Sequence, residues 1–151
     1  HVKFGKKAES VHLEDWPKDN FDKWHDAKLE EKWATLASLR EAVLKKLEEK
    51  REAGEIGSGL QARISLSTGD AKFKELLKEK KDELRYIFIV SRVDIAESPA
   101  DAKDLDTGVP VATRVDKAFG QKCQRCWNYS EAVGSDSSHP TLCERCVKVV
   151  S

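Results

Sequence analysis

The chain has 151 residues, which is enough for one ordinary domain or two small ones and too few for a large multidomain enzyme. Hydrophobic residues make up 39%, aromatic residues only 7%, and mean hydropathy is -0.61, so we expect a modest core in an elongated, solvent-rich shape. The 27 basic residues balance the 27 acidic ones, which excludes a strong overall field toward nucleic acid or an anionic membrane. Any such preference must be local.

The sequence also carries information about setting. No apolar run reaches the roughly 18 to 20 residues that span a bilayer, and the amino-terminal residues lack the apolar core of a signal peptide. We therefore expect a soluble, cytoplasmic protein without a membrane partner. The chain contains no methionine and begins with His1, which predicts that it is part of something longer.

The first long element is predicted after an irregular stretch at residues 1–25. Residues 26–51 place apolar side chains three, four or seven positions apart, which is the period of an amphipathic helix; these are Leu29, Trp33, Leu36, Val43 and Leu47. About 26 residues at 1.5 Å each give roughly 39 Å, longer than the small segments that follow could cover. Part of the apolar face is therefore expected to need a partner outside these segments.

A small sheet is predicted next. Glycines end the long helix, and residues 60–67 then alternate apolar and polar side chains, as in a half-buried strand. Asp70 is a suitable N-cap for one short helix that runs through Leu77 and ends in a solvated charge run. The continuous apolar run at residues 86–90, followed by alternation to Ile95, predicts a strand at the centre of the sheet.

The remaining part of the sheet is predicted after a surface loop at residues 97–108. Residues 109–115 alternate again, but Pro110 cannot donate to a ladder, so this strand is placed at an edge. The predicted fold class is α+β, with a long amphipathic helix, a small mixed sheet carrying one helix, and a carboxyl-terminal four-cysteine module. That module has too little apolar material for an independent core and needs a staple.

The staple is visible in the segments KCQRCWNY and LCERC, which give the spacing C-x2-C-x16-C-x2-C; the cysteines are Cys123, Cys126, Cys143 and Cys146. Two such C-x2-C turns can present four thiolates to one zinc ion. A site with four protein ligands leaves no open position for water. The predicted zinc is therefore structural and does not activate a nucleophile.

Two other interpretations of the cysteines stay open at this point. Two disulfides would also use all four thiols, although their clustering is unlike a secretory disulfide framework. A redox dithiol would need one C-x2-C at the start of a helix that follows a strand. His139 lies between the two pairs and could replace one thiol, but it more simply serves as a turn residue before Pro140.

The residues beside the first cysteine pair suggest a role beyond metal binding. Trp127 and Tyr129 offer flat stacking surfaces, and Arg125 and Lys122 offer cations suited to unstacked bases or phosphates. These four residues are the candidate RNA contacts. In the alternative interpretation, Trp127 forms a miniature core over the metal and the basic residues only offset the thiolate charge.

The carboxyl-terminal motifs, together with ESVHLEDWP, REAVLKKLEEKREAGEIGSGLQARISL and YIFIVSRV in the same order, resemble the C-terminal region of bacterial isoleucyl-tRNA synthetases. The resemblance covers most of the chain. It implies that residues 1–53 end a helical anticodon-binding domain, residues 54–119 form an α/β junction subdomain, and residues 120–151 form the zinc-binding module.

The same resemblance implies what the chain does and what it lacks. It implies that Arg125 and Trp127 are among the residues that touch the anticodon loop of isoleucine tRNA, and that the other partner is the remainder of the synthetase chain. Neither the HIGH nor the KMSKS signature occurs, so this chain is not expected to catalyse the ATP-dependent activation of isoleucine by itself.

Two functions from other classes remain as alternatives. A DNA-repair glycosylase-like enzyme can carry a similar four-cysteine finger, but this explains only the last thirty residues. A zinc-stapled protein-interaction module would use the uncovered helix stripe to bind a protein and would show no preference for isoleucine tRNA.

Overall fold

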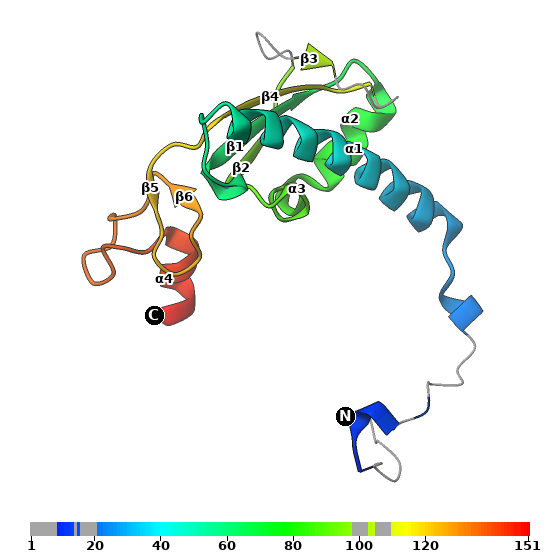
Figure 1. Ribbon diagram of the computed structural model, residues 1–151, viewed down its shortest axis with the longest axis horizontal. Helices are drawn as coiled ribbons and strands as arrows, with labels where there is room; N and C mark the ends of the chain where they lie inside the picture. The colour runs from blue at the N-terminus through cyan, green and yellow to red at the C-terminus, as the bar shows by residue number, and fades with distance from the viewer. Residues whose placement is uncertain (1–8, 14, 16–20, 98–102, 105–109) are drawn as a thin grey trace.

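The computed structural model describes most of the chain, namely residues 9–13, 15, 21–97, 103–104 and 110–151. Two short 3-10 helices, Val11–Leu13 and Phe21–Trp24, lie in the segment that was expected to be irregular. Helices and strands from α1 to β4 then form one unit, which we call the sheet unit. A smaller unit, from β5 to α4, follows the end of the last long strand (Figure 1). None of the helices in the described ranges combines the length and apolar character needed to cross a membrane.

Helix α1, Ala27–Glu52, confirms the long helix predicted from the apolar period. The Asp26 side chain begins it by accepting hydrogen bonds from the amides of Lys28 and Leu29, at 3.0 and 3.1 Å. Just beyond its last residues, Gly54 adopts a φ of 72°, a conformation that side chains other than glycine rarely take. The cap and the turn together set both ends of the helix.

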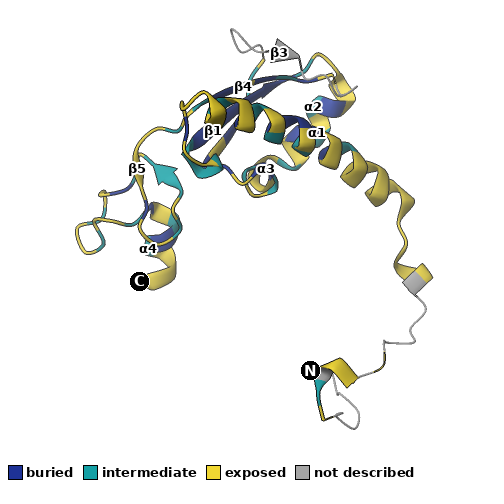
Figure 2. Cartoon of the chain, viewed as in Figure 1, coloured by how far each residue is buried: buried dark blue, intermediate teal, exposed yellow. Residues whose placement is uncertain are grey.

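Helix α1 is covered by the rest of the protein only along its later turns. Its apolar side chains there pack against β4 and α3, and the buried residues are Leu36, Leu39, Ala42, Val43 and Leu47. Nearer its beginning, Leu29 and Trp33 are 48% and 46% exposed, and this half of the helix projects away from the sheet (Figure 2). As predicted, the helix is longer than the segments that pack against it, so part of its apolar face is left uncovered.

Four strands form a mixed sheet in the order β2-β1-β4-β3, and their bounds are Arg92–Ile95, Ala62–Ser67, Ala112–Lys117 and Lys103–Asp104. Strand β1 pairs in parallel with β2 and antiparallel with β4. The α+β class and the mixed sheet are thus as predicted.

The predicted strand order is wrong in two places. Strand β1 is central and almost wholly buried, whereas it was expected to be half-buried, and β2 is an edge strand. Strand β4 was placed at an edge because of Pro110, but this proline precedes the strand, and Ala112 and Thr113 pair with β3. A proline outside the ladder places no limit on the strand that follows it.

The run at residues 86–90 was wrongly assigned to a strand. The connection from β1 to β2 contains two helices, α2 (Ala71–Glu79) and α3 (Lys81–Phe88), where one helix was predicted. Leu84 and Phe88 lie four residues apart and are both buried, as one face of a helix requires. A short apolar run does not distinguish a buried strand from a helix by its period alone.

Helix α3 ends on an unusual residue. Ile89 has a φ of 57°, which is sterically costly for a β-branched side chain, and it is exposed. Its carbonyl oxygen lies 2.8 Å from the position that a Cβ at Gly59 would occupy. Gly59 begins the 3-10 helix η3 (Gly59–Gln61), so the lack of a side chain there lets the two turns meet.

The carboxyl-terminal unit has its own small elements and its own core. A two-stranded ribbon, β5 (Gln121–Lys122) with β6 (Tyr129–Ser130), precedes helix α4 (Glu144–Val150). Its buried cluster is separate from the main one and consists of three cysteines and Val133. We call residues 120–151 the zinc module. Most of the loop predicted at residues 97–108 lies outside the described residues, but Lys103 and Asp104 within it form strand β3, which was not predicted.

Replacing Leu39 by alanine should lower the free energy of unfolding of the main core by about 2 to 5 kcal/mol, because its fully buried side chain would leave a cavity. Denaturant unfolding followed by far-UV circular dichroism measures this. The matched variant Leu29→Ala removes the same atoms from an exposed position and should cost much less. Equal losses in the two variants would contradict the burial described above.

Candidate metal centre

Each pair of cysteines lies at a sharp turn of the chain. Cys123 and Cys126 occupy the turn between β5 and β6, where the Trp127 amide donates to the Cys123 carbonyl at 2.9 Å. Cys143 and Cys146 lie at the start of α4, and the Cys146 amide donates to the Cys143 carbonyl, also at 2.9 Å. The two turns face each other, so four sulfurs converge on one point.

The four sulfurs have the spacing of a tetrahedral zinc site. Their Sγ atoms all lie within 4.8 Å of one another, and the Sγ atoms of Cys126 and Cys143 are 3.6 Å apart. A Zn–S bond of about 2.3 Å implies sulfur-to-sulfur edges of roughly 3.8 Å in a tetrahedron. Three of the four thiols are buried. The donor set therefore fits zinc, which would supply a structural cross-link and leave no ligand position for water.

Neighbouring donors point at these sulfurs. The Cys143 amide donates to Cys123 Sγ at 3.3 Å, and Arg125 Nη1 donates to Cys146 Sγ at 3.7 Å. Four thiolates around a divalent cation leave two formal negative charges. Amide dipoles and a guanidinium offset this charge and orient the sulfurs.

The surroundings of the sulfurs shift the pKa of two cysteines in opposite directions. Burial raises the pKa of Cys126, but hydrogen bonds from Asn128 and Arg145 outweigh it and lower the pKa to about 6. Burial and the neighbouring thiols raise the pKa of Cys143 to about 12. Four thiols this close cannot all ionise without a cation between them, because thiolates repel one another. A divalent metal provides that cation.

The alternatives for the cysteines are less well supported. All four are free thiols, and the 3.6 Å between Cys126 and Cys143 is far beyond a disulfide bond of about 2.05 Å. His139 is not in the sulfur cluster. Its amide donates to the Asp136 carboxylate at 2.9 Å, so it is the turn residue that was expected.

The structure places Trp127 and Lys122 together on the outside of the zinc module. The Trp127 ring is 60% exposed and is not part of the module's buried cluster, and Lys122 Nζ lies 5.2 Å from its centroid. Trp127 also has a φ of 64°, which costs a residue with a side chain of the order of 1 kcal/mol or more. The turn thus holds a large apolar ring out in solvent.

The other two predicted RNA contacts are more closely tied to the fold. Arg125 is exposed, but one of its nitrogens is hydrogen-bonded to Cys146 as described above. Tyr129 is half-buried, and its amide donates to Ser91 Oγ at 2.7 Å. All four predicted residues thus lie near the first cysteine pair, with Trp127 and Lys122 most open to a ligand.

The contacts between the zinc module and the sheet unit were not found from the sequence. Ser91 Oγ donates to the Leu60 carbonyl while it accepts from Tyr129, and Arg145 Nη1 donates to the Tyr86 hydroxyl at 3.2 Å. A serine or a tyrosine in a run of apolar residues gives no sequence signal of a contact 38 or 59 residues away.

Removing zinc with a chelator should unfold the zinc module and leave the main core folded, because the two buried clusters are separate. Zinc analysis should give one ion per chain before treatment. Hydrogen exchange followed by mass spectrometry should then show lost protection at residues 120–151 and retained protection in α1 and β1. Simultaneous loss in both regions would show that they fold as one unit.

Replacing Gly120 by alanine should weaken zinc binding. Gly120 has a φ of 82°, and an added Cβ would lie 2.2 Å from the Ser130 carbonyl atoms, so β5 and β6 would be forced apart. Competition with a coloured chelator measures the zinc affinity. Gly134→Ala is the matched control, because Gly134 has a φ of 94° but its nearest atom is 3.6 Å away. If both variants lose affinity equally, the close approach at Gly120 is not the cause.

Comparison with known proteins agrees with this geometry at two scales. Residues 120–149 match a family described as "Zinc finger found in FPG and IleRS". The finger alone does not separate the two kinds of protein in that description. The match includes all four cysteines of the cluster, which supports zinc as the ion.

Matches over the whole chain make the distinction. The isoleucine–tRNA ligase of Gloeobacter violaceus is 41% identical over 151 residues, which is 100% of this chain and 15% of the relative. The isoleucine–tRNA ligase of Syntrophotalea carbinolica is 40% identical over 147 residues, covering 97% of this chain and 16% of the relative. The chain thus spans about one sixth of the length of these relatives. Over its whole length the chain is homologous to part of the isoleucine–tRNA ligases, whose zinc-binding C-terminal region its motifs resemble.

Proposed function

We propose that this chain is a tRNA-binding part of an isoleucine–tRNA ligase and that its zinc module contacts the anticodon loop of isoleucine tRNA. The observation that carries the proposal is Trp127, which the first cysteine turn holds in a strained conformation with its ring in solvent. A strained and exposed aromatic residue gains nothing for the core of the module. It is suited to stack on an unpaired base.

Charge and rigidity around Trp127 support the same function. Lys122 Nζ lies over the ring and would meet the phosphate of a nucleotide stacked there. Arg125 is anchored through one nitrogen to Cys146, and a guanidinium has further donors for a base or phosphate. Loop bases of RNA are splayed out and can be read by such groups, whereas the deep groove of an A-form helix cannot.

Tyr129 has a supporting role in this proposal. Its amide bond to Ser91 fixes the ribbon that carries Trp127 against the sheet unit. The Tyr129 ring, in β6, also offers a second stacking surface two residues after Trp127. The zinc ion, by fixing both cysteine turns, would hold these groups in place before RNA arrives, which reduces the entropy cost of binding.

In this proposal the chain does not carry out the ligase reaction by itself. The relatives are ligases, and the chain spans only 15% of the length of the one from Gloeobacter violaceus. We therefore assign ATP use and isoleucine activation to other parts of such an enzyme, in the cytoplasm. The present residues would contribute binding and orientation of the tRNA.

The remainder of the synthetase chain is the second proposed partner. Leu29 and Trp33 lie half exposed on the projecting part of α1, in the segment assigned by resemblance to the end of the helical anticodon-binding domain. Contact with preceding helices of that domain would cover them. The subdomain boundaries at residues 53 and 119 remain predictions within this proposal.

Replacing Trp127 by glycine should weaken the selective binding of isoleucine tRNA without destabilising the zinc module. Glycine relieves the positive φ, while loss of one base–aromatic stack should lower affinity by roughly five- to 100-fold. Fluorescence anisotropy with labelled isoleucine tRNA and a second tRNA, at two salt concentrations, measures this. Arg125→Ala is tested alongside, with zinc content checked because Arg125 contacts a ligand.

The matched control is Trp33→Ala, which removes an exposed tryptophan from α1 and should leave tRNA binding in this chain unchanged. Equal affinity of the wild-type chain for both tRNAs would contradict anticodon recognition. Binding of neither tRNA would favour the protein-interaction function over the RNA-binding one.

A further inference from the structure

Two arginines from different units of the molecule converge on one exposed tyrosine. Tyr86 of α3 is 55% exposed, and its hydroxyl accepts hydrogen bonds from Arg85 Nη2 at 2.6 Å and from Arg145 Nη1 at 3.2 Å. Both guanidinium carbons also lie near the ring, at 4.6 and 6.0 Å from its centroid. Arg85 belongs to the sheet unit and Arg145 to the zinc module, so the group spans the junction.

The charges of these two arginines are not balanced by acidic side chains. Within the part of the chain that the structure describes, no ion pair joins Arg85 or Arg145 to a carboxylate, whereas Arg92 nearby is paired with Asp94 at 2.9 Å. The two guanidinium groups also hold the pKa of Tyr86 below its usual value, against the opposing effect of burial. Arg145 is also hydrogen-bonded to the Cys126 thiol, but neither arginine is paired with a carboxylate, and two guanidinium groups held side by side form a site for an anion.

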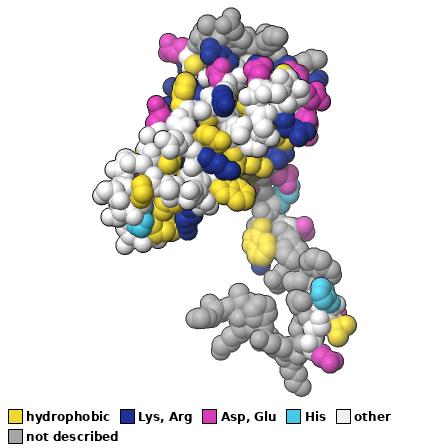
Figure 3. Space-filling view, turned by 60° about the vertical axis from the view of Figure 1, so that its left-hand side comes forward, with side chains coloured by type: hydrophobic (Ala, Val, Ile, Leu, Met, Phe, Trp, Pro, Cys, Tyr) yellow, Lys and Arg dark blue, Asp and Glu magenta, His cyan; other side chains and the backbone are white. Residues whose placement is uncertain are grey.

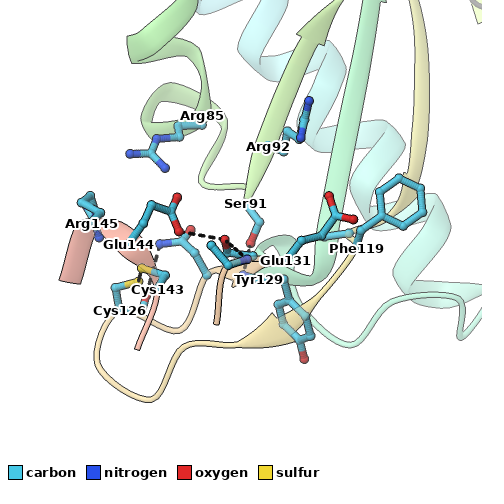
Figure 4. Close-up of a pocket in the computed structure, with 14 residues that line it drawn as sticks. Arg85, Ser91, Arg92, Phe119, Cys126, Tyr129, Glu131, Cys143, Glu144 and Arg145 are labelled. Atoms are coloured by element: carbon cyan, nitrogen blue, oxygen red, sulfur yellow. Dashed lines mark hydrogen bonds between the residues drawn. The ribbon is translucent and has the colours of Figure 1, made fainter. Parts of the chain in front are cut away.

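A cleft lies directly beside this group, between the zinc module and the sheet unit (Figure 4). Its volume is about 270 Å³, and both arginines line it together with Arg92, Ser91, Asn128 and Tyr129. Glu131 and Glu144 also line it, and Glu144 accepts a hydrogen bond from Ser130 at 2.9 Å. Basic and hydrophobic side chains lie next to each other on the surface in Figure 3.

The cleft begins one residue along the chain from the proposed RNA contact at Trp127. Trp127 is followed directly by Asn128 and Tyr129, which line the cleft, and the cleft leads to the two arginines. The Ser91 and Tyr129 hydrogen bond fixes one wall relative to the other. The cleft is therefore a candidate path for the nucleotides next to a base stacked on Trp127.

We propose that Arg85 and Arg145, held together by Tyr86, bind a backbone phosphate of the tRNA strand whose adjoining base stacks on Trp127. Each guanidinium has five donors, more than the phenol oxygen can accept, so donors remain for phosphate oxygens. Tyr86 is a positioning residue in this site, because its hydroxyl collects two cations that would otherwise repel. The inference rests on the proposed tRNA-binding function.

The test compares four variants of the zinc-loaded chain by anisotropy with labelled isoleucine tRNA over a series of salt concentrations. Arg85→Gln should lower affinity by roughly tenfold and reduce the slope of log affinity against log salt by about 0.7 to 0.9, the value for one lost phosphate contact. Tyr86→Phe keeps every charge but releases both guanidinium groups, so it should also lower affinity several-fold. Arg145 is left intact because it also contacts a zinc ligand.

Lys72→Gln is the matched control, because it removes one exposed charge from α2, far from the zinc module in Figure 1. Equal effects of Arg85→Gln and Lys72→Gln, or wild-type affinity in Tyr86→Phe, would overturn the phosphate site. If Trp127→Gly loses binding while both junction variants keep it, only this inference fails. If Trp127→Gly, Arg85→Gln and Tyr86→Phe all bind isoleucine tRNA like the wild-type chain, the proposed function fails as well. Zinc content and thermal melting verify that each variant is folded.

Discussion

The zinc module depends on the convergence of its four cysteines. Apart from the thiols, its buried cluster contains Val133, with Leu142 packed against it, which is far too little apolar surface to offset the entropy of ordering about thirty residues. A metal cross-link therefore determines whether Trp127 is held out in solvent, whether Arg125 is anchored, and whether Arg145 reaches Tyr86. Each RNA contact proposed within the zinc module depends on this one centre.

The parts of the fold that the sequence predicts well are those where one pattern has one structural solution. Helix α1 combines a sustained apolar period with Asp26 at its start, and the four cysteines combine a repeated turn with a repeated ligand. Both predictions agree with the structure because local chemistry alone determines them. The candidate ligand set needed no information about the rest of the fold.

The errors arise where tertiary context decides. The apolar run at residues 86–90 is compatible with either a strand or a helix. Only packing against the main core selects helix α3. The order of the strands likewise depends on which partners β1 meets on its two sides. The junction site is another example, because Tyr86, Ser91 and Arg145 have no common sequence pattern and come together only through the fold.

The turn that joins α3 to β2 connects the backbone contact at Gly59 with the attachment of the zinc module at Ser91. Gly59 approaches the Ile89 carbonyl so closely that even a methyl group would displace it, and Ile89 lies two residues before Ser91, which holds the ribbon of the zinc module. The angle of the zinc module against the sheet unit therefore depends on the backbone contact between Gly59 and Ile89, which lies next to the Ser91 and Leu60 hydrogen bond. A change of one side chain at position 59 would therefore move the proposed RNA-contacting surface, although residue 59 lies in neither the cysteine cluster nor that surface.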